Sequence, residues 1–219
     1  MRLRIIILFV LATAGSSARA QTGFPFDNEI RDFKHQDNLK FPPKNGILFI
    51  GSSSIRKWTD LEQRFSAQPI IRRGVGGCTL EQLVDYYTPY ILFPYRPKKV
   101  FIYAGENDIA AGNTGDFVAA EFTKLWGMLS SRLPKAEIYF MAIKPSPSRA
   151  EYLPEVTIAN KKIKAFLKSK KKGYYIDVAS AILNPTTMKP DPSLFEGDLL
   201  HLNKTGYDKW QAVLQPYVK

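Results

Sequence analysis

Short apolar or aromatic runs recur along the chain and alternate with stretches of helical periodicity. Five such runs stand out, at residues 47–50, 69–73, 99–104, 137–142 and 174–178. A strand that is apolar along most of its length is typically buried on both faces, as in a parallel sheet covered by helices. The pattern therefore predicts about five parallel strands in one sheet.

Segments with helix signals fill the intervals between these runs. Thr79 and Gln82 form a capping-box pattern, and apolar residues follow at helical spacing as far as residue 90. Asn203 has the position of an N-cap, whereas Pro134 and Gly173 stand where two long helices must stop. The predicted helices cover residues 27–39, 80–90, 117–133, 156–170 and 204–218.

Strands that alternate with helices indicate an α/β protein, which we expect to be a three-layer α/β/α sandwich with a flavodoxin-like parallel sheet. In open sheets of this kind, ligands bind beyond the carboxyl ends of the strands. A functional site is therefore expected in the loops after the first three strands, at residues 51–54, 74–79 and 105–108.

Residues 1–20 are predicted to be a signal peptide that does not belong to the fold. Arg2 and Arg4 precede an apolar run at residues 5–12, and a small-x-small pattern ends at Ala20. A retained N-terminal anchor is the alternative. Residues 21–219 have enough apolar side chains for one core, so we expect a single domain without an integral membrane segment, exported to the periplasm or the extracellular space.

The chain is basic, with a formal net charge of +11, and such a surface attracts anionic polymers, lipids or acidic sugars. Its densest basic run, residues 168–172, falls at a predicted helix end, where cations suit the helix dipole. No nucleic-acid motif accompanies this run, so no nucleic-acid partner is expected. The single cysteine, Cys78, and two histidines argue against an internal disulfide and a structural zinc site, and we expect neither a metal nor a cofactor.

Two segments of the chain carry the parts of an activated serine. Three serines, residues 52–54, follow the first strand, and a serine hydroxyl becomes a strong nucleophile only when a base removes its proton. Asp198 precedes His201 by three residues, a spacing that lets the carboxylate hold one ring nitrogen while the other faces the nucleophile. Taken alone, this segment could equally be a polar turn before a helix. The other histidine, His35, is expected to be solvated on an outer helix.

Acyl transfer also requires hydrogen-bond donors aimed at the oxygen that becomes negative. The glycine-rich loop at residues 74–78 can bring backbone N–H groups close to a ligand, and Asn107 can add a side-chain amide. Each signal has an alternative when taken alone. The serine turn could instead bind a phosphate with its backbone amides, and Asn107 could serve only to stabilise a turn.

Four sequence blocks, taken in their order along the chain, resemble those of the SGNH hydrolases, also called GDSL-type esterases or lipases. Within this family they resemble an acetylhydrolase-like branch with a GSSS block. The resemblance spans about residues 47–207, and its blocks are residues 51–55, 74–79, 105–108 and 198–201.

The resemblance implies a role for each residue of the site. It makes Ser53 the nucleophile, His201 the general base and Asp198 the carboxylate that orients it. The N–H groups of Ser53 and Gly77 and the amide of Asn107 would form the oxyanion hole. The activity implied is that of an exported serine esterase acting on short, acetyl-type esters of carbohydrates or related small-molecule or polysaccharide substrates. An acyltransferase with the same residues and a glycan-binding relative without turnover are the alternatives.

Several positions depart from the family pattern. Ser52 stands where aspartate is common, so the residues alone do not decide which hydroxyl among residues 52–54 reacts. Arg72 replaces a frequent asparagine, which leaves the hydrogen bonding between the first two blocks open. Cys78 replaces a small polar residue, so the site could be sensitive to oxidation. Arg149 could bind an anionic group of the substrate or brace its own loop.

Overall fold

The centre of the structure is a parallel sheet of five short strands. The computed structural model describes residues 25–219, and the predicted signal peptide at residues 1–20 lies outside this range. The strands are β1 (Ile47–Gly51), β2 (Ile70–Gly74), β3 (Lys99–Tyr103), β4 (Glu137–Met141) and β5 (Gly173–Ile176). They pair in the order β2-β1-β3-β4-β5, and every neighbouring pair is parallel. The prediction of an α/β sandwich with a five-stranded parallel sheet is confirmed.

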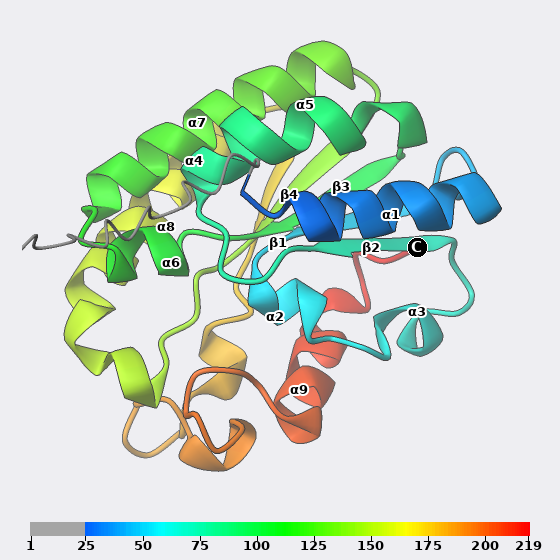
Figure 1. The fold of residues 1–219 in the computed structure, drawn as a ribbon. Helices are drawn as coiled ribbons and strands as arrows, with labels where there is room; N and C mark the ends of the chain where they lie inside the picture. The colour runs from blue at the N-terminus through cyan, green and yellow to red at the C-terminus, as the bar shows by residue number, and fades with distance from the viewer. Residues whose placement is uncertain (1–24) are drawn as a thin grey trace, which may run out of the picture.

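Helices cover both faces of this sheet (Figure 1). The α-helices are α1 (Asp27–Leu39), α2 (Ser53–Arg56), α3 (Leu61–Arg64), α4 (Leu80–Gln82), α5 (Thr88–Ile91), α6 (Glu106–Ala110), α7 (Gly115–Arg132), α8 (Leu153–Lys168) and α9 (Lys204–Leu214). Short 3₁₀ turns are η2 (Phe93–Tyr95), η3 (Pro147–Tyr152), η4 (Ser180–Ile182) and η5 (Pro192–Leu194). Within residues 25–219, no helix combines the length and apolar character needed to cross a membrane.

Alternate strand residues build two separate cores. Leu48 and Ile50 of β1 point to the face covered by α1, α7 and α8, whereas Ile47 and Phe49 point to the face covered by α3 and α9. This alternation follows from the two-residue period of a strand, and because both faces are covered all four residues are fully buried.

A row of aromatic rings crosses the sheet on the α9 side. Phe49, Phe101, Tyr139 and Tyr174 occupy matching register positions on β1, β3, β4 and β5. Successive ring centroids lie 4.6, 4.6 and 4.7 Å apart, and the rings are stacked. Cross-strand aromatic pairs of this kind stabilise a sheet beyond the burial of their area.

The predicted helix after Thr79 is not continuous, which corrects the sequence-based expectation. Thr79 and Gln82 do form a capping box at the start of α4, but residues Leu83–Tyr87 form a π-helical turn, labelled η1, before α5 begins. Pro89 lies in the first turn of α5, where the missing N–H of proline is tolerated. A regular helix through residue 89 would lose a backbone hydrogen bond there, so the helix changes its winding just before the proline.

The other predicted boundaries differ by a few residues at most. The start of α8 lies at Leu153, three residues before the predicted one, because Pro154 also falls in a first turn. The last helix, α9, ends at Leu214 rather than near residue 218. Its predicted cap is confirmed, because the Asn203 side chain accepts a hydrogen bond from the N–H of Gly206 at 3.0 Å.

Candidate active site

The three predicted loops meet at the carboxyl end of the sheet, where β1 turns sharply into α2. Gly51 has a φ of +132°, and a Cβ atom built there would lie only 1.8 Å from the carbonyl oxygen of Tyr103 on β3. The next N–H, that of Ser52, donates to the same oxygen at 2.9 Å. Only glycine permits this close approach, so β1 ends tightly against β3 and the following residue, Ser53, begins a helix at the edge of the sheet.

The structure distinguishes the three serines that the sequence left open. Ser52 and Ser54 are buried, with exposed fractions of 2% and 1%, whereas Ser53 is only half-buried. The Oγ atom of Ser53 lies 2.8 Å from Nε2 of His201. Of the three hydroxyls, that of Ser53 is therefore the one next to a base, although 148 positions separate the two residues in the chain.

His201 is held from its other side by Asp198. Oδ2 of Asp198 lies 2.6 Å from Nδ1 of His201, and Oδ1 accepts hydrogen bonds from the N–H groups of Leu200 and His201 at 2.9 Å each. Partial burial raises the pKa of Asp198, but these hydrogen bonds outweigh burial and hold the pKa well below its usual range. The carboxylate is thus ionised at neutral pH and fixes the ring with Nε2 toward Ser53.

The glycine-rich loop lies next to this pair. At Gly74 an added Cβ would come within 2.3 Å of the backbone nitrogen of Arg56, so the loop packs directly on α2. At Gly77, which has a φ of +76°, an added Cβ would meet no atom within 4 Å, because the residue faces open space. Within residues 25–219, the N–H groups of Ser53 and Gly77 donate no hydrogen bond. Both donors therefore remain available to a ligand.

The third loop connects to the glycine-rich loop through Asn107 and Asp108 of α6. Nδ2 of Asn107 donates to the carbonyl oxygen of Cys78 at 3.0 Å. Both carboxylate oxygens of the buried Asp108 lie 3.0 Å from the N–H of Leu80. These hydrogen bonds join the two loops, and the amide of Asn107 lies against Cys78, the residue after Gly77.

Arg149 lies against the third loop. Its Nη1 donates to Oδ1 of Asn107 at 3.2 Å and to the carbonyl oxygen of Glu106 at 3.3 Å, and lies 3.8 Å from the Glu106 carboxylate. These contacts of Arg149 brace the loop at residues 105–108.

Two site residues were missed by the sequence analysis, Glu106 and Lys144. Nζ of Lys144 donates to both carboxylate oxygens of Glu106 at 2.9 Å, and the Tyr103 hydroxyl donates to one of them at 2.7 Å. Burial lowers the pKa of Lys144, while the charge of Glu106 acts in the opposite direction. A signal was present, because Lys144 follows the fourth strand closely, at the same end of the sheet as the other site residues.

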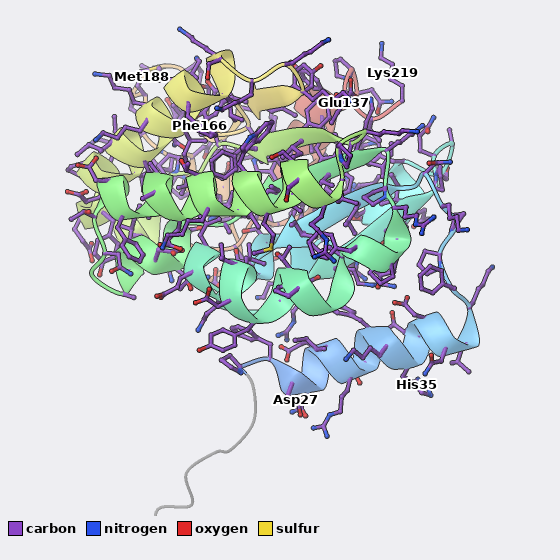
Figure 2. The ribbon with its side chains drawn as sticks, turned by 90° about the horizontal axis from the view of Figure 1, so that it is seen from above. Asp27, His35, Glu137, Phe166, Met188 and Lys219 are labelled. Atoms are coloured by element: carbon purple, nitrogen blue, oxygen red, sulfur yellow. The ribbon has the colours of Figure 1, made fainter. Side chains whose placement is uncertain are left out.

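Three residues noted in the sequence analysis lie outside the series of contacts that joins Ser53, His201 and Asp198. His35 lies on α1, on the outside of the molecule and exposed (Figure 2). Cys78 is buried, and burial together with the charge of Asp108 raises the pKa of its thiol, which opposes oxidation. Nη1 of Arg72 donates to the carbonyl oxygen of Arg56 at 2.7 Å, and the N–H of Val75 donates to the carbonyl oxygen of Gly51 at 2.8 Å, so the first two blocks are joined without an asparagine at position 72.

A half-buried serine, an imidazole and a carboxylate joined in series at the carboxyl end of a parallel sheet are the arrangement of a serine hydrolase. Comparison of the sequence with known families leads to the same class. Residues 49–209 match the model of the GDSL-like Lipase/Acylhydrolase family, and the chain belongs to this family.

Solved structures with the same fold include several hydrolases. A protein described as a candidate platelet activating factor from Streptococcus pneumonia superposes with a TM-score of 0.77 at 20% identity, over 88% of this chain and 92% of its own. A GDSL-like lipase from Bacteroides thetaiotaomicron gives 0.73 at 18% identity, over 86% and 96%. A variant of an acetyl-xylooligosaccharide esterase from Geobacillus Stearmophilus gives 0.64 at 13% identity, over 80% and 95%. No curated protein matches the chain by sequence.

Proposed function

We propose that the protein is a serine esterase that hydrolyses short acyl esters of carbohydrates or related compounds through an acyl-enzyme on Ser53. The observation that carries the proposal is the series of contacts from Ser53 Oγ to His201 Nε2, at 2.8 Å, and from His201 Nδ1 to Asp198 Oδ2, at 2.6 Å. Activation of a serine nucleophile explains why a serine, an imidazole and an ionised carboxylate from distant parts of the chain line up in this order.

Each step of the reaction has a residue in place. His201 accepts the proton of Ser53 as Oγ attacks the ester carbonyl, and Asp198 stabilises the imidazolium that forms. The N–H groups of Ser53 and Gly77 and the amide of Asn107 donate to the carbonyl oxygen as it becomes negative. His201 then passes the proton to the leaving alkoxide. A water molecule attacks the acyl-enzyme with His201 again as base, which releases the acid and restores the Ser53 hydroxyl.

Hydrolysis rather than acyl transfer is supported by the openness of the site. The side chain of Asp198 is 43% exposed, so water can approach the acid–base pair from the side of the carboxylate. A transferase has to exclude water while the acyl-enzyme waits for its acceptor alcohol. A binding module without turnover would leave the contacts of His201 without a purpose.

The substrate class is supported by the similar structures. One of them is an acetyl-xylooligosaccharide esterase, and another is a carbohydrate esterase family 3 protein from Talaromyces cellulolyticus. The signal-peptide pattern of residues 1–20 supports export, where polymeric carbohydrate esters are encountered.

The test is hydrolysis of p-nitrophenyl esters from acetate to long-chain acyl groups by the purified protein, by Ser53→Ala and by His201→Ala. Ser66→Ala, an exposed serine away from the site, is the matched control. We expect turnover of the shortest esters by the wild type and the control only, together with labelling of Ser53 by a fluorophosphonate probe. Full activity in Ser53→Ala would contradict the proposal, and product formation that depends on an added sugar alcohol would favour the transferase.

A further inference from the structure

The segment after β4, residues 144–149, contacts both halves of the site. On one side Lys144 and Arg149 contact Glu106 and Asn107. On the other side the N–H and the hydroxyl of Ser148 donate to the carbonyl oxygen of Leu199, between Asp198 and His201, at 3.1 and 3.0 Å. The proposed mechanism uses no side chain of this segment, so its contacts call for a separate explanation.

The ion pair of Lys144 and Glu106 is buried almost completely, with exposed side-chain fractions of 0% and 8%. Two hydroxyl groups add to the pair, because those of Tyr103 and Ser146 donate to the same carboxylate. Apolar residues of similar volume often stabilise a fold at least as well as such a pair. Stability alone is therefore a weak reason for two charges at this position.

The pair fixes a third charge beside the oxyanion donor. The Glu106 carboxylate lies between Nζ of Lys144, at 2.9 Å, and Nη1 of Arg149, at 3.8 Å. The carboxylate and Lys144 thus hold the guanidinium of Arg149 beside Asn107.

The contacts of Asn107 set the orientation of its amide. Oδ1 accepts from Arg149 at 3.2 Å, and Nδ2 donates to the carbonyl oxygen of Cys78 at 3.0 Å. Nδ2 carries a second N–H, and no acceptor within residues 25–219 takes it. In the reversed orientation the amide oxygen would face the Cys78 carbonyl and would repel an oxyanion. Arg149 therefore favours the orientation in which the free N–H is available.

We propose that Arg149 is a positioning residue that holds the Asn107 amide as an oxyanion donor, and that Glu106 and the buried Lys144 anchor Arg149 in place. This inference rests on the proposed esterase function and assigns Arg149 an action through Asn107 rather than a contact with the substrate.

A double-mutant cycle tests the proposal. Kinetic constants for p-nitrophenyl acetate are measured for Arg149→Met, Asn107→Ala and the double variant. Loss of one oxyanion donor lowers kcat by about 10²- to 10³-fold. A misoriented donor keeps part of its stabilisation of the transition state, so we expect Arg149→Met to lower kcat by roughly tenfold with KM little changed. In the Asn107→Ala background the same change should cost less than about twofold, because the group that Arg149 acts through is gone.

Three further variants separate positioning from other roles. Arg132→Ala, an exposed arginine beyond the amino ends of the strands, should leave both constants unchanged. Arg149→Lys should recover part of the lost kcat, since it restores a donor and the charge but not the planar fork. Ser148→Ala acts on the loop that holds Asp198 and His201. The fold-loss in kcat that it causes should therefore multiply with the fold-loss caused by Asn107→Ala, because the two act independently. Circular dichroism and thermal unfolding identify any variant that fails to fold.

The outcomes distinguish this proposal from the proposed function. If the fold-losses in kcat from Arg149→Met and Asn107→Ala multiply in the double variant, Arg149 does not position Asn107. The same conclusion follows if Arg149→Met only raises KM, and only for esters that carry a carboxylate. If the wild type hydrolyses no ester and Ser53 is not labelled by a fluorophosphonate, the esterase proposal fails and the positioning role fails with it. Non-additive losses in kcat in an active enzyme support the proposal.

Discussion

Asp108 is a buried carboxylate whose ionisation should lower the stability of the fold as the pH rises from about 4 to about 6. Its side chain is fully buried on α6, next to Asn107, and both of its oxygens face the N–H of Leu80. Burial raises the pKa of Asp108 from 3.8 to about 6, although the N–H groups at the start of α4 act in the opposite direction.

The folded chain therefore binds this proton more tightly than the unfolded chain does. Below about pH 4 both states are protonated and the group has no effect on stability. Between about pH 4 and 6 the unfolded state loses the proton first, so the free energy of unfolding falls by about 1.4 kcal/mol per pH unit. The total loss is about 3 kcal/mol, and it persists at higher pH. A domain of this size is stable by roughly 5–15 kcal/mol, so the effect is measurable.

The assay is denaturant unfolding of the wild type and Asp108→Asn at a series of pH values from about 4 to 8. The variant is neutral throughout and keeps one oxygen as an acceptor for Leu80. Relative to the wild type it should gain about 3 kcal/mol of stability as the pH rises from about 4 to 7. Asp32→Asn, at an exposed position of α1, is the control for removing one carboxylate. A difference that does not change with pH, or that moves in favour of the wild type, would refute the reasoning.

Three other predictions concern the carboxylate that holds His201, the turn before Ser53 and the N-terminal segment. Asp198→Asn should lower kcat by about 10²- to 10⁴-fold with little loss of stability, because the ring of His201 loses its ionised partner; steady-state kinetics and thermal unfolding measure the two effects. Gly51→Ala places a Cβ 1.8 Å from the Tyr103 carbonyl oxygen, and we expect a loss of roughly 2–6 kcal/mol in denaturant unfolding. If residues 1–20 are a signal peptide, the exported protein begins at Gln21. N-terminal sequencing of exported material measures this start, and any other first residue would contradict the prediction.

Much of this fold follows from local patterns in the sequence. The five strands come from continuous apolar runs, and Asn203 identifies the start of the last helix because an N-cap is a local interaction. The π-helical turn at Leu83–Tyr87 could not be predicted in this way. Its residues keep an apolar spacing compatible with an ordinary helix, and the cause, Pro89, lies beyond the turn itself.

The site shows the same limit. Asp198 and His201 could be paired from the sequence because three residues separate them. The pair of Glu106 and Lys144 spans 38 positions, and neither residue belongs to a pattern that points to the other. This ion pair joins α6 to the segment after β4, and a single sequence contains no measure of the distance between two such segments.

The aromatic row on the sheet has a consequence for how the protein opens. The row crosses β1, β3, β4 and β5 but not β2, where Arg72 is the register partner of Phe49. The edge strand β2 thus lacks the stacked ring that joins each other strand to its neighbour, and its amide hydrogens should exchange with solvent through local opening. Those of β1 and β3, paired on both sides, should exchange only when the whole molecule unfolds. Ser53 lies two residues beyond the end of β1, one of these protected strands, so the proposed nucleophile would stay in place even while the edge of the sheet fluctuates.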